Sequence, residues 1–404
     1  MTSRWQPADQ FPAAPPLPEL ESRDAAYPEN VSAALPPAMP PGPVYPSANS
    51  YAAPADWATA ENQPASLRPR SAMEVLTGLS EKVSQGAVAE YQPIPLGLSP
   101  LDRTLGGGIR SGELMLIGGA QGTGKTTMAL QIARNIAQSG QANALYICFE
   151  HDEEYLLNRL MAMESALAGP MPPDTTKSIR IQDVRREVLG TWMAQGGQDK
   201  ADLRANPRLR PALDRIARYG QGLYLLRGSH AHTNAANVRQ MIESYRAAAP
   251  ARPLVVFIDY LQRVPAVPDP PTETERVTNV VAALKDLALG LGVAVVCIVA
   301  ADKEGLKAAR LRNHHLRGSS ALNYESDVIL ILNEKYHIVA KVNIEFNPHQ
   351  AQRFRDWTIM TVEKNRSGRD AVDLEFEKHF EFSCFDPEGR QVQEKLIEER
   401  LYSD

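Results

Sequence analysis

The chain has 404 residues, of which 43% are hydrophobic and 23% charged, with a formal net charge of −5. These are the fractions of a globular protein, and the negative total excludes a globally basic nucleic-acid binder, so contact with DNA would need a local patch. The cysteines at 148, 297 and 384 form no C-x-x-C pair, which excludes a zinc ribbon or a disulfide framework. Without a signal-peptide core or an apolar run of membrane-spanning length, we expect a soluble cytoplasmic protein with no membrane partner.

The first part of the chain differs sharply from the rest. Residues 1–70 hold roughly half of the 31 prolines and little periodic apolar content. This composition predicts a disordered proline-rich tail, either simply solvated or able to dock a protein partner. Residues 387–404 are expected to form a second, C-terminal tail.

Residues 71–92 are predicted to form an amphipathic linker helix. Ser71 and Glu74 have the spacing of a capping box, and Leu76, Leu79 and Val83 fall on one helical face. That apolar face would pack against its own domain or against a neighbouring subunit, and the sequence does not choose between the two.

Residues 93–386 alternate apolar strands with helical patterns, which indicates an α/β domain with a mostly parallel twisted sheet flanked by helices. A turn at 366–369 predicts a hairpin near the end of this domain. Helical stripes are expected around 238–245 and 277–291, and helical or irregular surface around 168–215. The expected strands cover 114–117, 144–149, 254–258, 294–299, 328–332, 357–364 and 372–376.

The run from Gly119 to Thr126 is a complete G-x-x-x-x-G-K-[ST] phosphate loop between a strand and a helix. Its glycines let backbone N–H groups turn toward anionic phosphates at a helix N-terminus. Lys125 is expected to reach the β- and γ-phosphates of ATP, and Thr126 to coordinate Mg²⁺. The predicted nucleotide-binding residues are Gly119, Ala120, Gln121, Gly122, Thr123, Gly124, Lys125, Thr126 and Thr127.

Two carboxylates end other predicted strands. Asp259 follows the apolar run 254–258 in a Walker B arrangement, which predicts a second Mg²⁺-holding group. Glu150 follows 144–149 and should emerge at the same sheet edge, where it could polarise an attacking water. The next three residues, 151–153, are expected to cap a helix.

The segment 94–113 resembles the lead-in of RecA-type ATPases of the DnaB, RadA and KaiC groups. Further motifs recur in the order found in DnaB-type replicative helicases: Phe149-Glu150, 156–160, Ile258-Asp-Tyr-Leu-Gln262, Arg317 to Asp327 and Lys364-Asn-Arg366. The resemblance covers about 71–386. It implies a RecA-like P-loop NTPase fold, a hexameric ring of identical subunits, and an ATP-dependent helicase or translocase acting on single-stranded DNA.

The resemblance also implies roles for basic residues. It assigns Lys125 and Glu150 to catalysis, together with Lys364 and Arg366, which would enter the adjacent subunit's site and stabilise transition-state charge there. It further implies that a local basic patch grips single-stranded DNA through its phosphates. The predicted DNA-binding residues are Lys303, Lys307, Arg310, Arg312 and Arg317.

The chain departs from the DnaB pattern at several positions. Ala300 and Ala301 stand where these helicases carry a Ser-Gln pair, and Gly318 and Ser320 replace the usual Glu and Gly. Instead of the helical N-terminal domain there is the proline-rich tail. These departures, with the Gly106–Gly108 lead-in, favour an alternative: a KaiC-like regulatory ATPase that switches assembly or protein partners without unwinding DNA. A small-molecule kinase is a more distant alternative.

Overall fold

The computed structural model describes residues 69–86, 88, 91–197, 201–249, 252–339, 352–393 and 396. The chain divides into two units, Met1–Val75 and Leu76–Asp404. Nearly all of the predicted proline-rich tail therefore lies outside the described residues. The helices and strands of the described residues belong to the second unit, apart from the start of the first helix.

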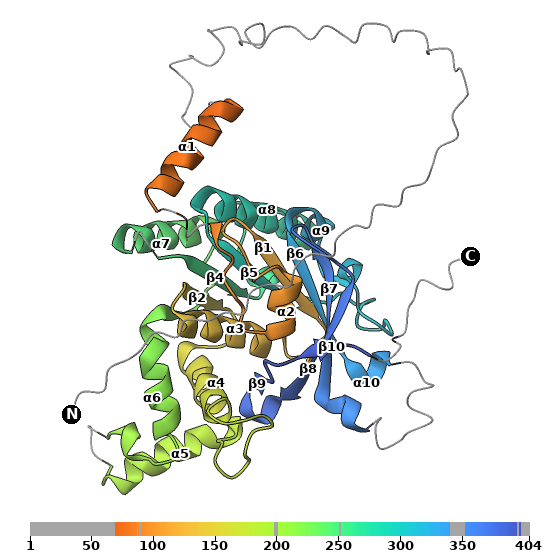
Figure 1. Ribbon diagram of the computed structural model, residues 1–404. Helices are drawn as coiled ribbons and strands as arrows, with labels where there is room; N and C mark the ends of the chain where they lie inside the picture. The colour runs from red at the N-terminus through yellow and green to blue at the C-terminus, as the bar shows by residue number, and fades with distance from the viewer. Residues whose placement is uncertain are drawn as a thin grey trace, which may run out of the picture. The chain divides into compact units, whose positions relative to one another are not determined.

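The central element is a sheet in the order β10-β8-β7-β6-β1-β5-β4-β2-β3, with β9 paired to β8 (Figure 1). The six strands from β6 to β3 in this order are parallel, whereas β7, β8 and β10 join antiparallel. The strands are β1 (Leu114–Gly119), β2 (Asn143–Cys148), β3 (Leu223–Arg227), β4 (Leu254–Asp259), β5 (Ala294–Ala300), β6 (Val328–Glu334), β7 (Trp357–Asn365), β8 (Val372–His379), β9 (Cys384–Phe385) and β10 (Arg390–Gln391).

Helices cover both faces of this sheet (Figure 1). The helices of the described residues are α1 (Ala72–Ser84), α2 (Ser99–Thr104), α3 (Lys125–Ser139), α4 (Glu153–Ala166), α5 (Ile181–Ala194), α6 (Arg210–Tyr219), α7 (Ala235–Ala248), α8 (Glu273–Leu291), α9 (Ala321–Glu325) and α10 (Lys335–Ile338). Short 3-10 turns include η6 (Leu261–Arg263), η7 (Asn313–His315) and η9 (Phe380–Phe382).

Strand β1 shows why the sheet needs two helical layers. Met115 and Ile117 belong to one apolar core, which includes the buried side chains of α3 and α4. Leu114 and Leu116 belong to a second core with α7 and α8. Because successive side chains of a strand point to opposite faces, an uninterrupted apolar run must be covered on both sides. Burying each such side chain contributes about 1.5–3 kcal/mol.

The strand registers define two opposite edges of the sheet. The parallel strands β1 to β6 all end at one edge, which we call the carboxyl edge. Strand β7 runs the other way, so that Asn365 pairs with Val328 at the start of β6, and Met115 at the start of β1 pairs with that same residue. The end of β7 therefore lies at the amino edge.

The first helix begins as the sequence predicts. The Ser71 N–H donates to Glu74 Oε2 at 2.7 Å, and the Glu74 N–H donates to Ser71 Oγ at 3.1 Å. Both halves of the capping box are thus present. No residue of α1 is buried, and Leu76, Leu79 and Val83 are exposed.

The region predicted as helical or irregular surface contains α5 and α6 and has a small core of its own. A buried carboxylate, Glu164 of α4, joins these helices to the domain. It accepts from Arg134 Nε of α3 at 2.5 Å and from Arg215 Nε of α6 at 2.6 Å. Burial and this carboxylate raise the pKa of the neighbouring Tyr219 hydroxyl.

The seven predicted strands are confirmed within two or three residues of their ends, as is the hairpin between β7 and β8. Three strands were not predicted: β3, β9 and β10. Strand β10 extends the sheet past the predicted domain end at residue 386, because Arg390 and Gln391 pair with β8. No helix of the described residues is long and apolar enough to cross a membrane.

Candidate nucleotide site at the carboxyl edge

The phosphate loop joins the end of β1 to the start of α3. Gly124, the N-cap of α3, has φ 94°, and a Cβ added there would lie 2.5 Å from Phe380. Only glycine fits this backbone and this contact without strain. The Thr123 hydroxyl and the Lys125 ammonium donate to the Ala120 carbonyl at 2.9 and 2.8 Å. The loop is thus folded tightly around its own lysine.

Lys125 lies close to two carboxylates. Burial lowers the pKa of its ammonium, while the negative charges of Asp259 and Glu150 act in the opposite direction. A desolvated ammonium near the N-terminus of a helix attracts anions strongly because little water screens it. The residue therefore suits a phosphate group.

Asp259 ends β4 and is 2% exposed. Its Oδ2 accepts from the Tyr146 hydroxyl at 3.0 Å, and its carboxylate also bonds to Thr126. Burial raises the pKa of Asp259 to about 6, against these hydrogen bonds. A hydroxyl and a carboxylate held together are the oxygen donors that Mg²⁺ accepts. The predicted pair, Thr126 and Asp259, therefore fits a divalent cation.

Glu150 lies just beyond β2, is exposed, and lines the same pocket as the phosphate loop. The residues after it begin α4. Asp152 caps that helix by accepting from the Tyr155 N–H at 2.8 Å, and Glu153 accepts from the Arg227 N–H at 2.8 Å. The predicted capping role is confirmed for Asp152. His151 instead lines the pocket, with its ring 3.9 Å from that of Tyr155.

The pocket has a volume of about 580 Å³ and brings the predicted residues together. Its lining includes most of the phosphate loop with Glu150 and Asp259. It also includes residues that the sequence patterns did not assign to the site: His151, Arg159, Tyr260, Leu306 and Phe380. A volume of this order suits a nucleotide-sized ligand.

Arg159 of α4 is one of these unassigned residues. Its guanidinium donates to Thr127 Oγ1 at 3.2 Å and to Ser383 Oγ at 3.1 Å, and it lies over the Tyr155 ring at 5.1 Å. The Arg159 Nε is buried without a hydrogen-bond partner among the described residues. A lone arginine soon after Glu150 was the available signal. For Phe380, which comes from η9 far along the chain, there was none.

The base of the loop after β5 is fixed beside this pocket. Gln262 of η6 donates to the Arg317 carbonyl at 2.7 Å and accepts from the Ala300 N–H at 3.3 Å. Ala300 in turn accepts from the Arg317 N–H at 2.8 Å. Ala300 and Ala301 line the pocket with methyl groups only, so their side chains cannot report a phosphate by hydrogen bonding.

The structure contradicts one residue of the basic patch predicted after β5. Arg310 is 2% exposed, pairs with Asp373, and donates to Thr361 Oγ1 at 3.0 Å. The prediction that Arg310 contacts DNA is wrong for this fold, because a buried and paired guanidinium cannot reach a phosphate strand. The charge pattern could not reveal a partner 63 residues further along the chain.

The other four residues of the patch differ among themselves. Arg312 is half-buried and pairs with Glu363 at 2.9 Å, and Arg317 pairs with Glu273 at 2.8 Å. Lys303 and Lys307 are exposed, and neither forms an ion pair within the described part of the chain. The freely available positive charge of this loop is therefore that of the two lysines.

Lys364 and Arg366 lie at the other end of the sheet. Lys364 pairs with Ile329 near the start of β6, while the phosphate loop follows Gly119, which pairs with Leu332. Ile329 pairs with Leu116 of β1, so three residues of β1 separate these levels, or about 10 Å of strand before the loop begins. Neither cation lines the pocket of its own subunit.

The parallel sheet, phosphate loop and Asp259 define a P-loop ATPase domain with a RecA-like fold. A profile of the AAA domain family matches residues 97–305, slightly more than half of the chain. The chain belongs to this AAA domain family.

Individual relatives point in the same direction. The chain is 25% identical over 298 residues to the replicative DNA helicase DnaB of Treponema pallidum, covering 73% of this chain and 56% of that protein. It is 48% identical over 59 residues to the DNA repair protein RadA of Mycobacterium tuberculosis, covering 15% and 12%. The chain thus spans only part of the relatives that it matches.

A solved structure of a DnaB-like replicative helicase superposes with a TM-score of 0.57 at 19% identity, covering 78% of this chain and 67% of that chain. At this level of identity the likeness shows the fold. Together with the family match, it confirms the predicted RecA-like, DnaB-type ATPase domain.

Proposed function

We propose that this protein is an ATP-dependent DNA translocase or helicase of the DnaB type that hydrolyses ATP between the subunits of a ring, most simply a hexamer. The observation that carries this proposal is the separation of the two sets of charged groups. Lys125, Thr126, Asp259 and Glu150 surround one pocket, while Lys364 and Arg366 lie at the opposite edge of the sheet. One subunit thus has each half of a P-loop active site but cannot bring them together.

Within the pocket, the roles follow from position. The loop N–H groups and Lys125 bind the phosphates of ATP, and Thr126 and Asp259 hold Mg²⁺, which would neutralise phosphate charge. Glu150 orients the attacking water and takes up its proton. Arg159 anchors the start of α3 through Thr127, and the edge of the pocket at Phe380 provides an aromatic surface for the base.

The second half of the site comes from a neighbour. A heterologous contact that closes into a ring places the amino edge of each subunit against the carboxyl edge of the next. Lys364 and Arg366 then reach the γ-phosphate in trans, where an arginine stabilises the transition-state charge. Hydrolysis would therefore require assembly.

The DNA-binding part of the proposal rests on the loop after β5. Its exposed lysines, Lys303 and Lys307, are suited to backbone phosphates, with Arg312 and Arg317 available if their ion pairs exchange for phosphate. Leu306 of the same loop lines the nucleotide pocket. A change at the γ-phosphate would therefore act directly on the loop that contacts the single-stranded DNA.

A regulatory ATPase resembling KaiC is the second candidate, and Ala300 and Ala301 favour it. Two methyl groups line the pocket where a polar side chain would sense the γ-phosphate. A single experiment separates the two: the ATPase rate with and without single-stranded DNA, together with a strand-displacement assay. We expect stimulation and displacement. DNA-independent hydrolysis without displacement would reject the helicase function.

A further inference from the structure

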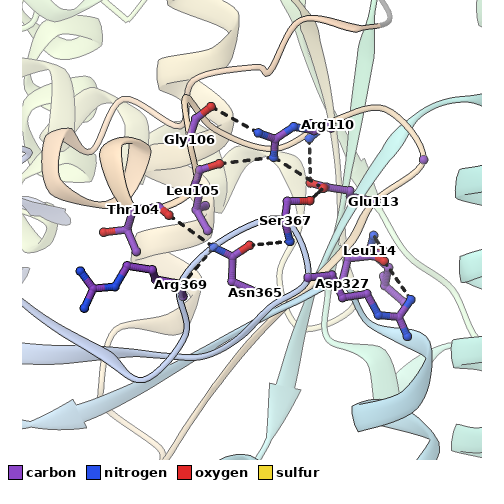
Figure 2. A network of polar contacts seen from close by, with 12 residues as sticks. Thr104, Leu105, Gly106, Arg110, Glu113, Leu114, Asp327, Asn365, Ser367 and Arg369 are labelled. Carbon is purple, nitrogen blue, oxygen red and sulfur yellow. Dashed lines mark hydrogen bonds and ion pairs between the residues drawn. The ribbon is translucent and has the colours of Figure 1, made fainter. Parts of the chain in front are cut away.

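Asp327, directly before β6, belongs to the polar network at the amino edge, beside Leu114 (Figure 2). Its side chain is 10% exposed. Oδ2 accepts from the Leu114 N–H at 2.8 Å and from Lys285 Nζ at 2.6 Å, while Oδ1 accepts from the Arg366 guanidinium at 3.2 Å. One of its partners, Arg366, is a proposed catalytic cation.

The backbone around Arg366 is anchored on both sides (Figure 2). Before it, Asn365 Nδ2 donates to the Thr104 carbonyl at 3.3 Å. After it, Ser367 Oγ donates to Glu113 Oε1 at 3.0 Å. The Arg366 N–H itself donates to the Asp327 carbonyl at 3.0 Å. With the backbone fixed in this way, the direction of the arginine depends on what holds its side chain.

Two acceptors hold that side chain: the Asp327 carboxylate and the Tyr324 carbonyl at the end of α9. A guanidinium has five N–H groups, so these two bonds leave three without a partner among the described residues. The side chain is half exposed. Arg366 is therefore held firmly on one side and has donors left for an external anion.

Lys364 follows the same pattern. Its ammonium donates to the Asn323 carbonyl and, at 2.6 Å, to the Ser326 carbonyl, which leaves one of its three N–H groups without a partner among the described residues. Burial lowers the pKa of this ammonium. Both cations are thus attached to the short segment 323–327.

We propose that Asp327 is a positioning residue that aims Arg366 at the nucleotide site of the neighbouring subunit. This inference rests on the proposed trans role of Arg366. Through the Leu114 N–H, the same carboxylate is tied to the first residue of β1, whose other end carries the phosphate loop. Asp327 thereby connects the nucleotide pocket of its own subunit with Arg366, which would complete the pocket of the neighbouring subunit.

The alternative is an ion pair that serves only the stability of the fold, and Asp327→Asn tests between them. Asparagine keeps the shape and can still accept from Leu114, but it lacks the charge that orients the guanidinium. Displacing a catalytic group by about 1 Å can cost about 10²-fold in rate, so we expect kcat to fall by about 10- to 100-fold. ATP binding and KM should remain unchanged because the pocket is intact.

Asp373→Asn is the matched control. This substitution also neutralises a partly buried aspartate that pairs with an arginine. Asp373 lies on the antiparallel strand β8, pairs with Arg310, and has no bond to Arg366. The kcat of this variant, measured below its melting temperature, should equal that of the unmodified protein. If Asp327→Asn does not fold, Asp327→Glu keeps the charge and moves it by one methylene, and a smaller loss of kcat is then expected.

Mixed assemblies give the decisive result. Subunits with Asp327→Asn keep an intact pocket, so adding Lys125→Ala subunits, whose Arg366 is correctly held, should restore hydrolysis. Adding Arg366→Ala subunits should not. An unchanged or increased kcat, or a loss that Lys125→Ala subunits do not rescue, would overturn the positioning role. Full activity of Arg366→Ala alone would instead reject the trans assignment in the proposed function.

Discussion

The two edges of the sheet are built differently, although both concentrate charge. At the carboxyl edge, Lys125, Asp259 and Glu150 face a common pocket of about 580 Å³. At the amino edge, Lys364 and Arg366 are bound to carbonyls and to Asp327, with donors left over. We call the carboxyl edge with its pocket the receptor edge, and Lys364 with Arg366 at the amino edge the arm. Under the proposed function, the functional unit is therefore a pair of subunits.

The largest effect should come from the arm. Arg366→Ala removes a transition-state charge worth about 10³–10⁵ in rate, so kcat should fall by that order while ATP binding is kept. Steady-state ATPase assays paired with nucleotide-binding titration check this. Equal loss of binding and turnover would show that the arm acts on ground-state binding or on assembly.

A smaller loss is expected from the receptor edge. Glu150→Gln keeps the shape of the side chain but removes the base, which typically contributes about 10²–10⁴-fold. Single-turnover hydrolysis should slow by this factor with an unchanged ATP dissociation constant. A variant that hydrolyses ATP near the original rate would show that another group activates the water.

In the loop after β5, the buried residue Arg310 should support the stability of the fold, whereas the exposed residue Lys307 should not. Breaking the buried pair of Arg310 and Asp373 by Arg310→Ala should lower the free energy of unfolding by about 3–5 kcal/mol. Lys307→Ala, an exposed change in the same loop, should stay within about 0.5 kcal/mol. Denaturant titration of both variants measures this, and equal stabilities would contradict the assigned burial.

The smallest effect concerns the salt dependence of DNA binding. Replacing Lys303 and Lys307 by glutamine should reduce the slope of log K against log salt by about 0.7 for each phosphate of a single strand that the variant no longer neutralises. Fluorescence anisotropy over a salt series gives the slope. If the slope does not change, these lysines do not contact the strand, and the gripping surface must lie elsewhere.

The sequence predicted the receptor edge better than the arm, for a physical reason. The residues of the receptor edge follow buried strands, and parallel strands end together, so position in the chain gives position in space. The apolar runs were long enough to locate seven strands. Strands β9 and β10 are two residues long and offer no such run. Strand β3 has a short apolar run, 223–226, but it is partly exposed and was not assigned to a strand.

Proximity between distant segments could not be predicted. Phe380 reaches the pocket from η9, and Asp373 of β8 pairs with Arg310 of the loop after β5. The sequence does not distinguish an exposed basic residue from a buried one, so the loop after β5 was interpreted as one continuous basic patch. For Asp327, only the structure reveals that three donors converge on one carboxylate.

The central claim is that the pocket of one subunit and the arm of the next form one active site. The most direct measurement is the ATPase rate of Lys125→Ala and Arg366→Ala subunits, each alone and then mixed. Each variant alone should be nearly inactive, and mixing should restore hydrolysis, because some interfaces then combine an intact pocket with an intact arm. Mixtures that remain as inactive as their components, although the subunits exchange, would contradict the account.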